Sequence, residues 1–561
     1  MLRRNQIILV LWAALICSQA AMGQWLVLDQ RVDLGAIPNN MAMWNNRIEG
    51  PYNFWTEPNI TDINDWSEIT EPKNVFTNLN GWSKFEAVFD NDNAVTWVPT
   101  NSNTMPDAET LAWIDAGHVY VTNPDANDPI TLYGLTMSGN GEMTIDGGHI
   151  TFATGYGEKN WGYSTVCVGR NNGTSILNIK DGTFTVPNGI RSMHGFASDP
   201  NKTVTGIINQ SGGTYVSGDL FEAAATEYAD MVEVAGLTDV ETVDGAVEAA
   251  ANSKCKFIYN LSGGLLDGSS SSRISMGKSR FCTGIMNVSG GVLDGGRYLR
   301  IGYEGFGELN ISGGLVMSSS IINGTNQREG MYLPYGAGSA EAAQGFGVPT
   351  NGGKLTITGG ELYVGRRDSD DPSDLVFGKY DGSRVADIVN VDLTGGQLFA
   401  RSLKNTGGIA TTFRMGGMGD ANDTRADVWF FEDFLLGHGG FENAARDAAA
   451  TALGVPLTTK IIAVIGSSEY WSIVVYRNAD LTGATLEVEL DGTPIQVGQT
   501  WDVLITDYDG NGDATPEITG APTTVSGPAG YNFSVSVIEN PDPSASAVSR
   551  ILQVKLDSID N

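Results

Sequence analysis

The chain has 561 residues, and its 65 acidic side chains outnumber its 33 Lys and Arg residues, for a formal net charge of −32. Phosphate binding needs a basic footprint, so this charge argues against nucleic acid as a partner. Hydrophobic residues make up 41% of the chain, enough for a core, and the 71 glycines indicate short strands joined by tight turns.

The first 23 residues are typical of a secretory signal peptide. A basic MLRR start precedes the apolar run IILVLWAALI, and SQAAMG then offers small residues for cleavage near Gly23. The apolar run is short for a membrane span, and no second run of spanning length follows. We therefore expect an exported chain, secreted or at the cell surface, whose mature form has no transmembrane segment.

Residues 24–110 are rich in aromatic side chains. Such a cluster can stack on sugar rings, but at the open end of a repetitive β structure it more often covers strand edges that would otherwise be unpaired. We therefore interpret this region as an N-terminal cap. Its tryptophans are Trp25, Trp44, Trp55, Trp66, Trp82 and Trp97.

Residues 111–440 contain an imperfect repeat. Within one copy, polar and apolar residues alternate as in a half-buried strand, and a Gly pair then allows a sharp bend. Repeated strands and glycine corners, about 25 residues per copy, predict an all-β fold in which each coil of a parallel β-solenoid buries its apolar side against its neighbours. The copies are MTIDGGHI (143–150), LNIKDGTF (177–184), INQSGGTY (208–215), YNLSGGLL (259–266), MNVSGGVL (286–293), LNISGGLV (309–316), LTITGGEL (355–362) and VDLTGGQL (391–398).

One position of the repeat is asparagine in five copies. Stacked in phase, these side chains predict a ladder of amides that bond from coil to coil. Asn260, Asn287 and Asn310 also start glycosylation sequons, but the repeat produces these without any sugar, so we favour the ladder. The five residues are Asn178, Asn209, Asn260, Asn287 and Asn310.

Cys255 and Cys282 share one position of the repeat and are 27 residues apart, the length of one coil. In register, their Cα atoms would lie about 5 Å apart, within disulfide range. Export favours a disulfide, whereas two stacked thiols in a core fit the same spacing, so both alternatives stay open.

Two segments look helical and the last segment looks different from the repeats. Residues 221–254 are rich in Ala and acids and predict a helical insertion, and 442–454 predict a second helix. After it, alternating runs such as TLEVELDG and RILQVKLDS predict a C-terminal antiparallel β module, either a separate sandwich or a cap, so that 441–561 combine a helix with this module.

The stretch DYDGNGD is the best candidate for a metal site. Asp507, Asp509, Asn511 and Asp513 place oxygen ligands at alternate positions, as in the first half of a calcium-binding loop. The twelfth position is Ile518 rather than an acid, so an acidic hairpin turn is the interpretation that we favour over calcium.

Signals for catalysis are few. The four histidines have no metal-ligand spacing, and no nucleophile–base pair is visible. A stripe of basic residues in consecutive coils could contact an anionic glycan, although isolated cations that balance nearby acids are the commoner outcome. The stripe consists of Arg273, Lys278, Arg280, Arg297 and Arg300.

The segments GIINQSGGTY (206–215), FIYNLSGGLLDG (257–268) and GELNISGGL (307–315) resemble the autotransporter-type β-helix repeats of bacterial surface proteins, including proteins that carry a PEP-CTERM sorting signal. The resemblance implies an exported, pectin-lyase-like right-handed β-helix with a surface role. The end VKLDSIDN lacks the sorting tail of that group. We therefore expect a non-catalytic structural or adhesive solenoid that contacts extracellular polysaccharide or cell-surface components; the alternative is a carbohydrate-active protein that binds or cleaves an acidic polysaccharide.

Overall fold

The computed structural model describes residues 106–560 with internal gaps, the longest at 154–165, 227–254, 336–350, 417–426 and 438–457, together with three strands nearer the N-terminus. The signal peptide, most of the aromatic-rich region, the 442–454 segment and the DYDGNGD stretch lie outside the described residues. Their predictions are therefore not addressed by the structure.

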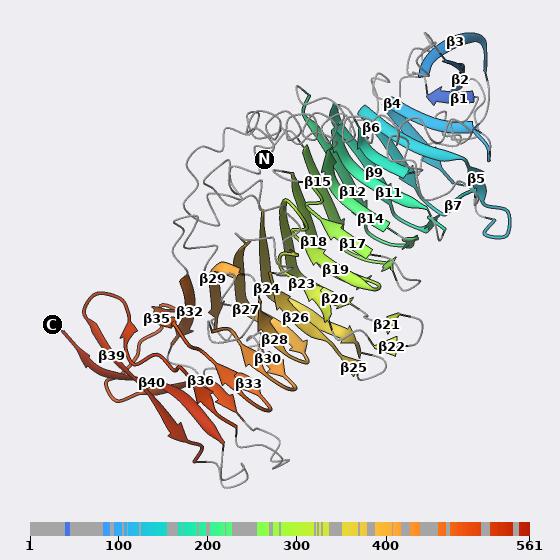
Figure 1. Ribbon diagram of the computed structural model, residues 1–561. Helices are drawn as coiled ribbons and strands as arrows, with labels where there is room; N and C mark the ends of the chain where they lie inside the picture. Colours follow the sequence, from blue (N-terminus) through green and yellow to red (C-terminus); the bar gives the residue numbers. More distant parts are fainter. Residues whose placement is uncertain are drawn as a thin grey trace, which may run out of the picture.

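The described residues form an all-β structure. One sheet of 38 strands, most of them paired in parallel, runs the length of the molecule, and no helix occurs in the described part. Figure 1 shows the strands side by side along one long axis, from β4 near one end to β36, β39 and β40 near the other. The prediction of a parallel, solenoid-like β architecture is confirmed at this level.

Each coil contributes to three stacks of parallel strands. The first stack carries the repeat motifs and comprises β4 (Thr110–Val121), β6 (Gly134–Ile145), β9 (Gly173–Ile179), β12 (Val204–Gln210), β15 (Cys255–Leu261), β18 (Thr283–Asp294), β20 (Phe306–Ser318), β24 (Asn351–Arg366), β27 (Asp387–Ala400), β29 (Gly408–Met415), β32 (Thr458–Ile465), β35 (Ala484–Leu490) and β38 (Val525–Ser526).

The second stack follows the Gly pairs. It comprises β5 (Ile130–Leu132), β7 (Gly148–Phe152), β10 (Gly182–Thr185), β13 (Thr214–Val216) and β16 (Leu265–Asp267), then the ends of β18, β20, β24 and β27, and finally β30 (Asp427–Phe430), β33 (Ile473–Val475) and β36 (Thr500–Thr506).

The third stack completes each coil. It comprises β8 (Val166–Arg170), β11 (Arg191–Ala197), β14 (Leu220–Thr226), β17 (Arg273–Met276), β19 (Tyr298–Ile301), β23 (Glu329–Tyr332), β26 (Asp374–Phe377), β28 (Leu403–Asn405), β31 (Phe434–Leu435), β34 (Ala479–Asp480) and β37 (Ile518–Thr519).

Eight of the described strands lie outside these stacks. At one end, β1 (Asn40–Trp44) pairs in parallel with β4, while β2 (Trp82–Phe89) and β3 (Val95–Asn103) add antiparallel pairs. On the side of the coils lie β21 (Ile321–Ile322), β22 (Thr325–Asn326) and β25 (Asp371–Pro372). At the other end, β39 (Tyr531–Glu539) pairs antiparallel with β40 (Arg550–Ile559); β40 also pairs antiparallel with β36.

The core lies inside the coils because alternate residues of each strand point inward. Met286, Leu309 and Leu355 occupy the same position in three successive coils and are fully buried. The same alternation that predicts a half-buried strand therefore builds one continuous apolar core along the axis.

The Gly pairs form the corners between the first and second stacks. Gly291 and Gly314 have φ angles of 71° and 74°, which L side chains rarely adopt. A Cβ on Gly291 would also lie 2.6 Å from the carbonyl oxygen of Gly264 in the preceding coil. Glycine is needed here because the chain both turns and touches its neighbour.

Two boundaries differ from the sequence prediction. Strands β32–β38, in a segment expected to form an antiparallel module, continue the parallel stacks, and among the described strands there antiparallel pairs form only between β40 and its neighbours β36 and β39. Residues 221–226, expected at the start of the helical insertion, belong to β14. In both places pairing with the previous coil decides the structure, and that pairing is not visible in local sequence.

Among the described residues, no helix has the length and hydropathy of a membrane span.

Candidate functional site: an arginine–tyrosine surface

The five asparagines of the repeat form a ladder on the outer face of the first stack. After Asn178, each amide donates through Nδ2 to Oδ1 of the asparagine in the preceding coil: Asn209 to Asn178 (2.9 Å), Asn260 to Asn209 (2.8 Å), Asn287 to Asn260 (2.8 Å) and Asn310 to Asn287 (2.9 Å). The ladder ties consecutive coils together and fixes their register.

Cys255 and Cys282 lie next to each other in adjacent coils, in continuation of the register of β15 and β18. Both are buried, and neither is in a disulfide in the structure; the Cys255 thiol lies 2.8 Å from the carbonyl oxygen of Gly195. Burial and the contact with Cys255 raise the pKa of Cys282 well above its usual value, so it stays protonated.

Four of the five basic residues predicted as a stripe come together on the third stack, and Arg280 lies outside the described residues. Arg273 of β17 pairs in register with Tyr298 of β19, and Ser275 with Arg300. Tyr303 follows the glycine corner after β19, and Tyr335 follows the end of β23. We call this set the arginine–tyrosine surface: Arg273, Lys278, Arg297, Arg300, Tyr298, Tyr303 and Tyr335.

Its cations lie against the aromatic rings. The Arg300 guanidinium carbon is 4.2 Å from the ring centre of Tyr335, 4.9 Å from that of Tyr303 and 5.2 Å from that of Tyr298. Lys278 Nζ is 3.9 Å from the Tyr303 ring centre. The Tyr303 and Tyr335 rings stack with centres 5.0 Å apart and planes at 8°. These cation–π contacts hold the charged groups in fixed places.

The arginines of this surface have few polar partners. Among the described residues its single ion pair joins Lys278 Nζ to Glu222 Oε1 at 3.5 Å. The Nε atoms of Arg273, Arg297 and Arg300 are buried and have no hydrogen-bond acceptor. In a chain with 65 acidic against 33 basic side chains, arginines without a carboxylate partner are unexpected.

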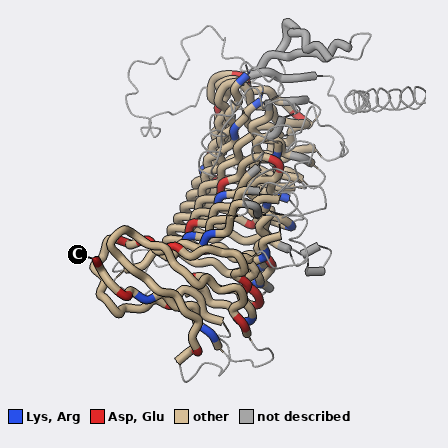
Figure 2. Tube along the Cα trace, turned by 60° about the vertical axis from the view of Figure 1, so that its left-hand side comes forward, with Lys and Arg blue, Asp and Glu red and all other residues tan. Residues whose placement is uncertain are grey.

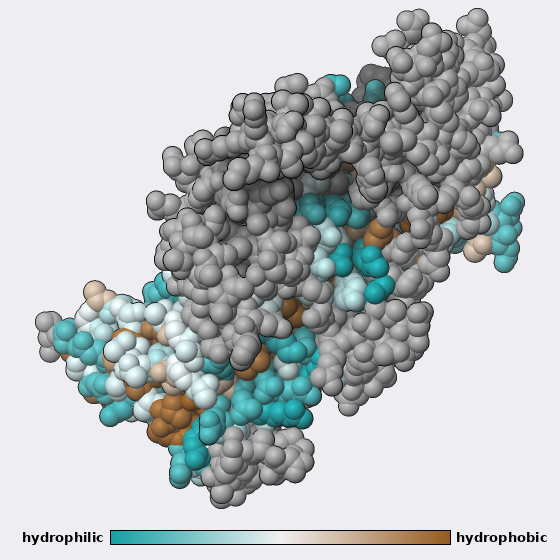
Figure 3. All heavy atoms as spheres, in the orientation of Figure 1, coloured by the Kyte–Doolittle hydropathy of each residue, from teal (hydrophilic) through white to brown (hydrophobic). Residues whose placement is uncertain are grey.

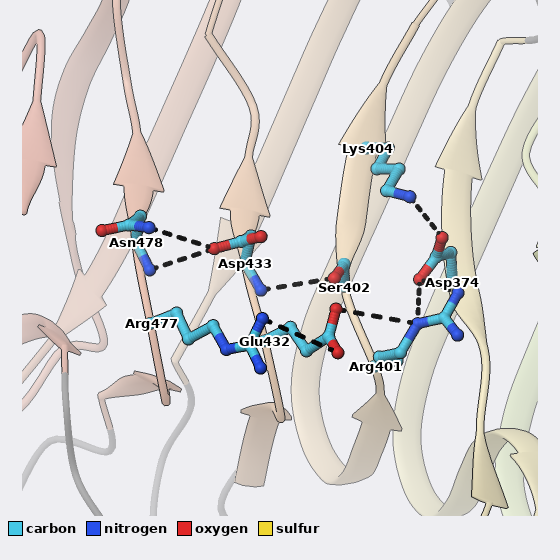
Figure 4. Close-up of polar contacts among 8 residues, drawn as sticks. All are labelled: Asp374, Arg401, Ser402, Lys404, Glu432, Asp433, Arg477 and Asn478. Carbon is cyan, nitrogen blue, oxygen red and sulfur yellow. Dashed lines mark hydrogen bonds and ion pairs between the residues drawn. The ribbon is translucent and has the colours of Figure 1, made fainter. Parts of the chain in front are cut away.

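A different arrangement holds the charges further along the same stack (Figure 4). The Asp374 side chain is fully buried and accepts from Arg401 Nε at 2.8 Å and from Lys404 Nζ at 2.5 Å. Glu432 lies 4.0 Å from Arg401 and 3.9 Å from Arg477. Acidic and basic side chains alternate here from coil to coil, so each of these cations lies next to a carboxylate. Figure 2 shows both signs of charge interspersed along the molecule.

Sequence comparison adds no assignment: the chain matches no known family of proteins and no curated protein.

A second polar cluster lies at the start of the ladder. His118 Nε2 is 2.8 Å from the Thr144 hydroxyl and 3.6 Å from Glu142, and the Tyr120 hydroxyl is 2.9 Å from His118 Nδ1. Asn178 donates to Glu142 at 2.8 Å. Burial, helped by the charge of Lys180, lowers the pKa of His118 to about 4, so the imidazole is neutral at pH 7. Burial also raises the pKa of Glu142.

No group of three or more His, Cys, Asp or Glu side chains in the described residues could hold a metal ion. The calcium prediction for Asp507, Asp509, Asn511 and Asp513 falls outside that part of the chain and stays a prediction.

The sequence analysis missed the tyrosines of the surface. A signal was present: Lys278 and Tyr303 each directly follow a glycine that ends an apolar run (ISMG-K and LRIG-Y), so they occupy the same corner of successive coils. Aligning this corner from coil to coil would have placed both residues beside Arg300.

Figure 3 shows mostly hydrophilic residues over the coloured part of the surface, with hydrophobic ones gathered in a few places, including the C-terminal end.

Proposed function

We propose that this protein is an exported β-solenoid with a structural or adhesive role outside the cell or on its surface, and that it works without catalysis. In this proposal the coils wind as a right-handed β-helix, and the β39–β40 hairpin caps the C-terminal end. The observation that carries the proposal is the register: ladder, core and corners repeat from coil to coil, as in a stiff rod built to present its sides.

Stiffness follows from how each coil is held. A coil in the middle of the stack forms backbone hydrogen bonds with neighbours on both sides, buries its apolar face against them, and adds a ladder bond between side chains. Bending would strain these interactions at every coil at once. A rigid spacer with long lateral faces suits multivalent contact with a surface or matrix.

Export is supported by the N-terminal sequence, whose basic start, short apolar run and small-residue segment suit a secretory signal. The acidic composition suits solubility outside the cell.

The test uses the chain with and without residues 1–23, expressed in a bacterial host and detected by antibody on intact cells and in the medium. We expect the complete chain outside the cytoplasm, shortened by the leader, and the truncated chain inside. Beads coated with the purified protein should adhere to extracellular matrix preparations better than beads coated with albumin. Retention of the complete chain in the cytoplasm, or no adhesion, would overturn the proposal.

The arginine–tyrosine surface favours a second candidate, a carbohydrate-active protein that binds or cleaves an acidic polysaccharide. Cleavage is tested separately by incubating the protein with polygalacturonate and measuring new chain ends. Their appearance at a rate proportional to protein concentration would replace the non-catalytic proposal with a lyase or hydrolase.

A further inference from the structure

We infer that the arginine–tyrosine surface is a binding site for an acidic polysaccharide, and that its arginines contact carboxylate or sulfate groups of that chain. The inference deepens the adhesive role proposed above, on which it rests for the extracellular setting, by naming the surface and the chemistry of its ligand.

Stacking on tyrosine does not use the hydrogen-bonding capacity of arginine. A guanidinium group contacts an aromatic ring through its flat face, while its N–H donors point outward in its plane. Arg300 is held this way by three rings and, among the described residues, has no hydrogen bond and no ion pair. The tyrosines therefore orient donors whose natural partner is an anionic oxygen.

The site attracts anions locally, although the protein as a whole repels them. Arg273, Arg297 and Arg300 are half-buried, so solvent screens their charges less than it screens fully exposed ones. One carboxylate, Glu222, is paired with Lys278 at the edge of the surface, and it is only 5% exposed. Elsewhere on the third stack, at Asp374, the protein supplies its own carboxylate to Arg401 and Lys404. Here it leaves the position to a ligand.

The spacing of the cations and rings along the axis indicates the shape of the ligand. Tyr298 and Tyr303 belong to the β19 coil, Arg273 and Lys278 to the β17 coil, and Tyr335 to the β23 coil. Three coils at the usual strand spacing extend about 10 Å along the axis. Cations spaced over that length beside half-buried aromatic rings suit an acidic sugar chain, which offers repeated anions and apolar ring faces.

Nucleic acid has the same charge and also stacks on aromatic rings, but the observations favour the glycan. Binding of a phosphate backbone needs an extended basic surface, whereas the cations here are confined to a few coils of a chain with a net charge of −32. An oligonucleotide therefore belongs in the test as a competing outcome.

The experiment measures binding of the complete purified chain to immobilised dextran sulfate, polygalacturonate, neutral dextran and a single-stranded oligonucleotide. We expect binding to dextran sulfate, polygalacturonate or both, weakened by added salt, and none to dextran. Binding to one acidic polysaccharide alone identifies its anion, sulfate or carboxylate, as the group recognised.

Variants locate the site. Charged hydrogen bonds of this kind support a loss of about tenfold for Arg300→Gln and about a hundredfold for the Arg273→Gln/Arg300→Gln pair. Arg300→Lys, which keeps the charge but not the planar fork, should lie between Arg300→Gln and the unchanged protein. The matched control is Arg477→Gln, an exposed arginine paired with Glu432, which should bind like the unchanged protein. Circular dichroism identifies variants that have lost the fold; for those, Arg300→Lys is the informative comparison.

Three results would overturn the inference: no binding to either acidic polysaccharide, unchanged binding by the folded double variant, or equally tight binding of the oligonucleotide. The first would leave the export and adhesion tests untouched, so failure of the site is distinguishable from failure of the proposed function.

Discussion

Replacing Asp374 by Asn probes how far the third stack depends on its buried charges. Asp374 is fully buried and holds Arg401 (13% exposed) and Lys404 (38% exposed) through hydrogen-bonded ion pairs. Asn has almost the same shape but no charge. The substitution therefore leaves two cations side by side without their carboxylate, while the packing of the coil stays nearly unchanged.

The size of the effect follows from burial. Removing one partner of a buried ion pair costs about 3–5 kcal/mol, because the remaining charge stays desolvated. Glu432 lies 4.0 Å from Arg401, too distant a contact to replace the buried carboxylate of Asp374. At about 1.4 kcal/mol per factor of ten, local opening of these coils should become at least about a hundredfold more frequent.

Hydrogen–deuterium exchange is the suitable assay, because a solenoid can open locally without unfolding as a whole. Amides of β26 and β28 should exchange faster in Asp374→Asn, whereas those of β12, many coils away, serve as an internal control. Lys404→Met is the matched variant. It should cost less than about 1 kcal/mol, since Lys404 is partly exposed and Asp374 keeps Arg401.

Unchanged exchange at β26 and β28 in Asp374→Asn would refute the reasoning that this carboxylate neutralises desolvated cations. An equal effect of Asp374→Asn and Lys404→Met would also contradict it, because the cost should follow from burial of the charge rather than from the number of ion pairs lost.

Three further predictions concern the repeat and its N-terminal cluster. Asn287→Ala breaks two ladder bonds and should lower the free energy of unfolding, measured in urea, by about 2 kcal/mol. Asn172→Ala, at an exposed position, is the control and should have almost no effect. Equal effects of the two substitutions would argue against the ladder. Gly291→Ala should cost about 2–4 kcal/mol, because Ala at φ 71° is strained and its Cβ meets the previous coil; an unchanged melting temperature would contradict this. His118 has a pKa near 4 when folded against 6.5 when unfolded, so its contribution is complete above pH 6.5 and is lost as pH falls toward 4, by up to about 3 kcal/mol. Melting temperatures between pH 7 and 4 should fall less in His118→Gln than in the unchanged protein, and parallel curves would show that His118 is not responsible; the raised pKa of Glu142 acts in the opposite direction in both proteins.

The sequence by itself determined the repeating part of the fold. Alternation in MNVSGGVL and LNISGGLV sets which residues face inward, and the Gly pair sets where each coil turns. The ladder could be predicted because stacked copies bring identical residues to identical positions, so the register follows once the repeat is recognised. Asn287 therefore bonds Asn310 for the same reason that Met286 packs on Leu309.

The tertiary structure decided what does not repeat. Arg300 lies against Tyr335, although 34 residues separate them in the chain and the local sequence does not reveal the path of those residues. Asp374 binds Arg401 and Lys404 because neighbouring coils bring them together. Strands β32–β38 look like an independent module in sequence, yet they join the parallel stacks because pairing with the preceding coil satisfies their backbone groups. Repetition makes shape readable from sequence, while the charges that could bind a partner depend on contacts between coils.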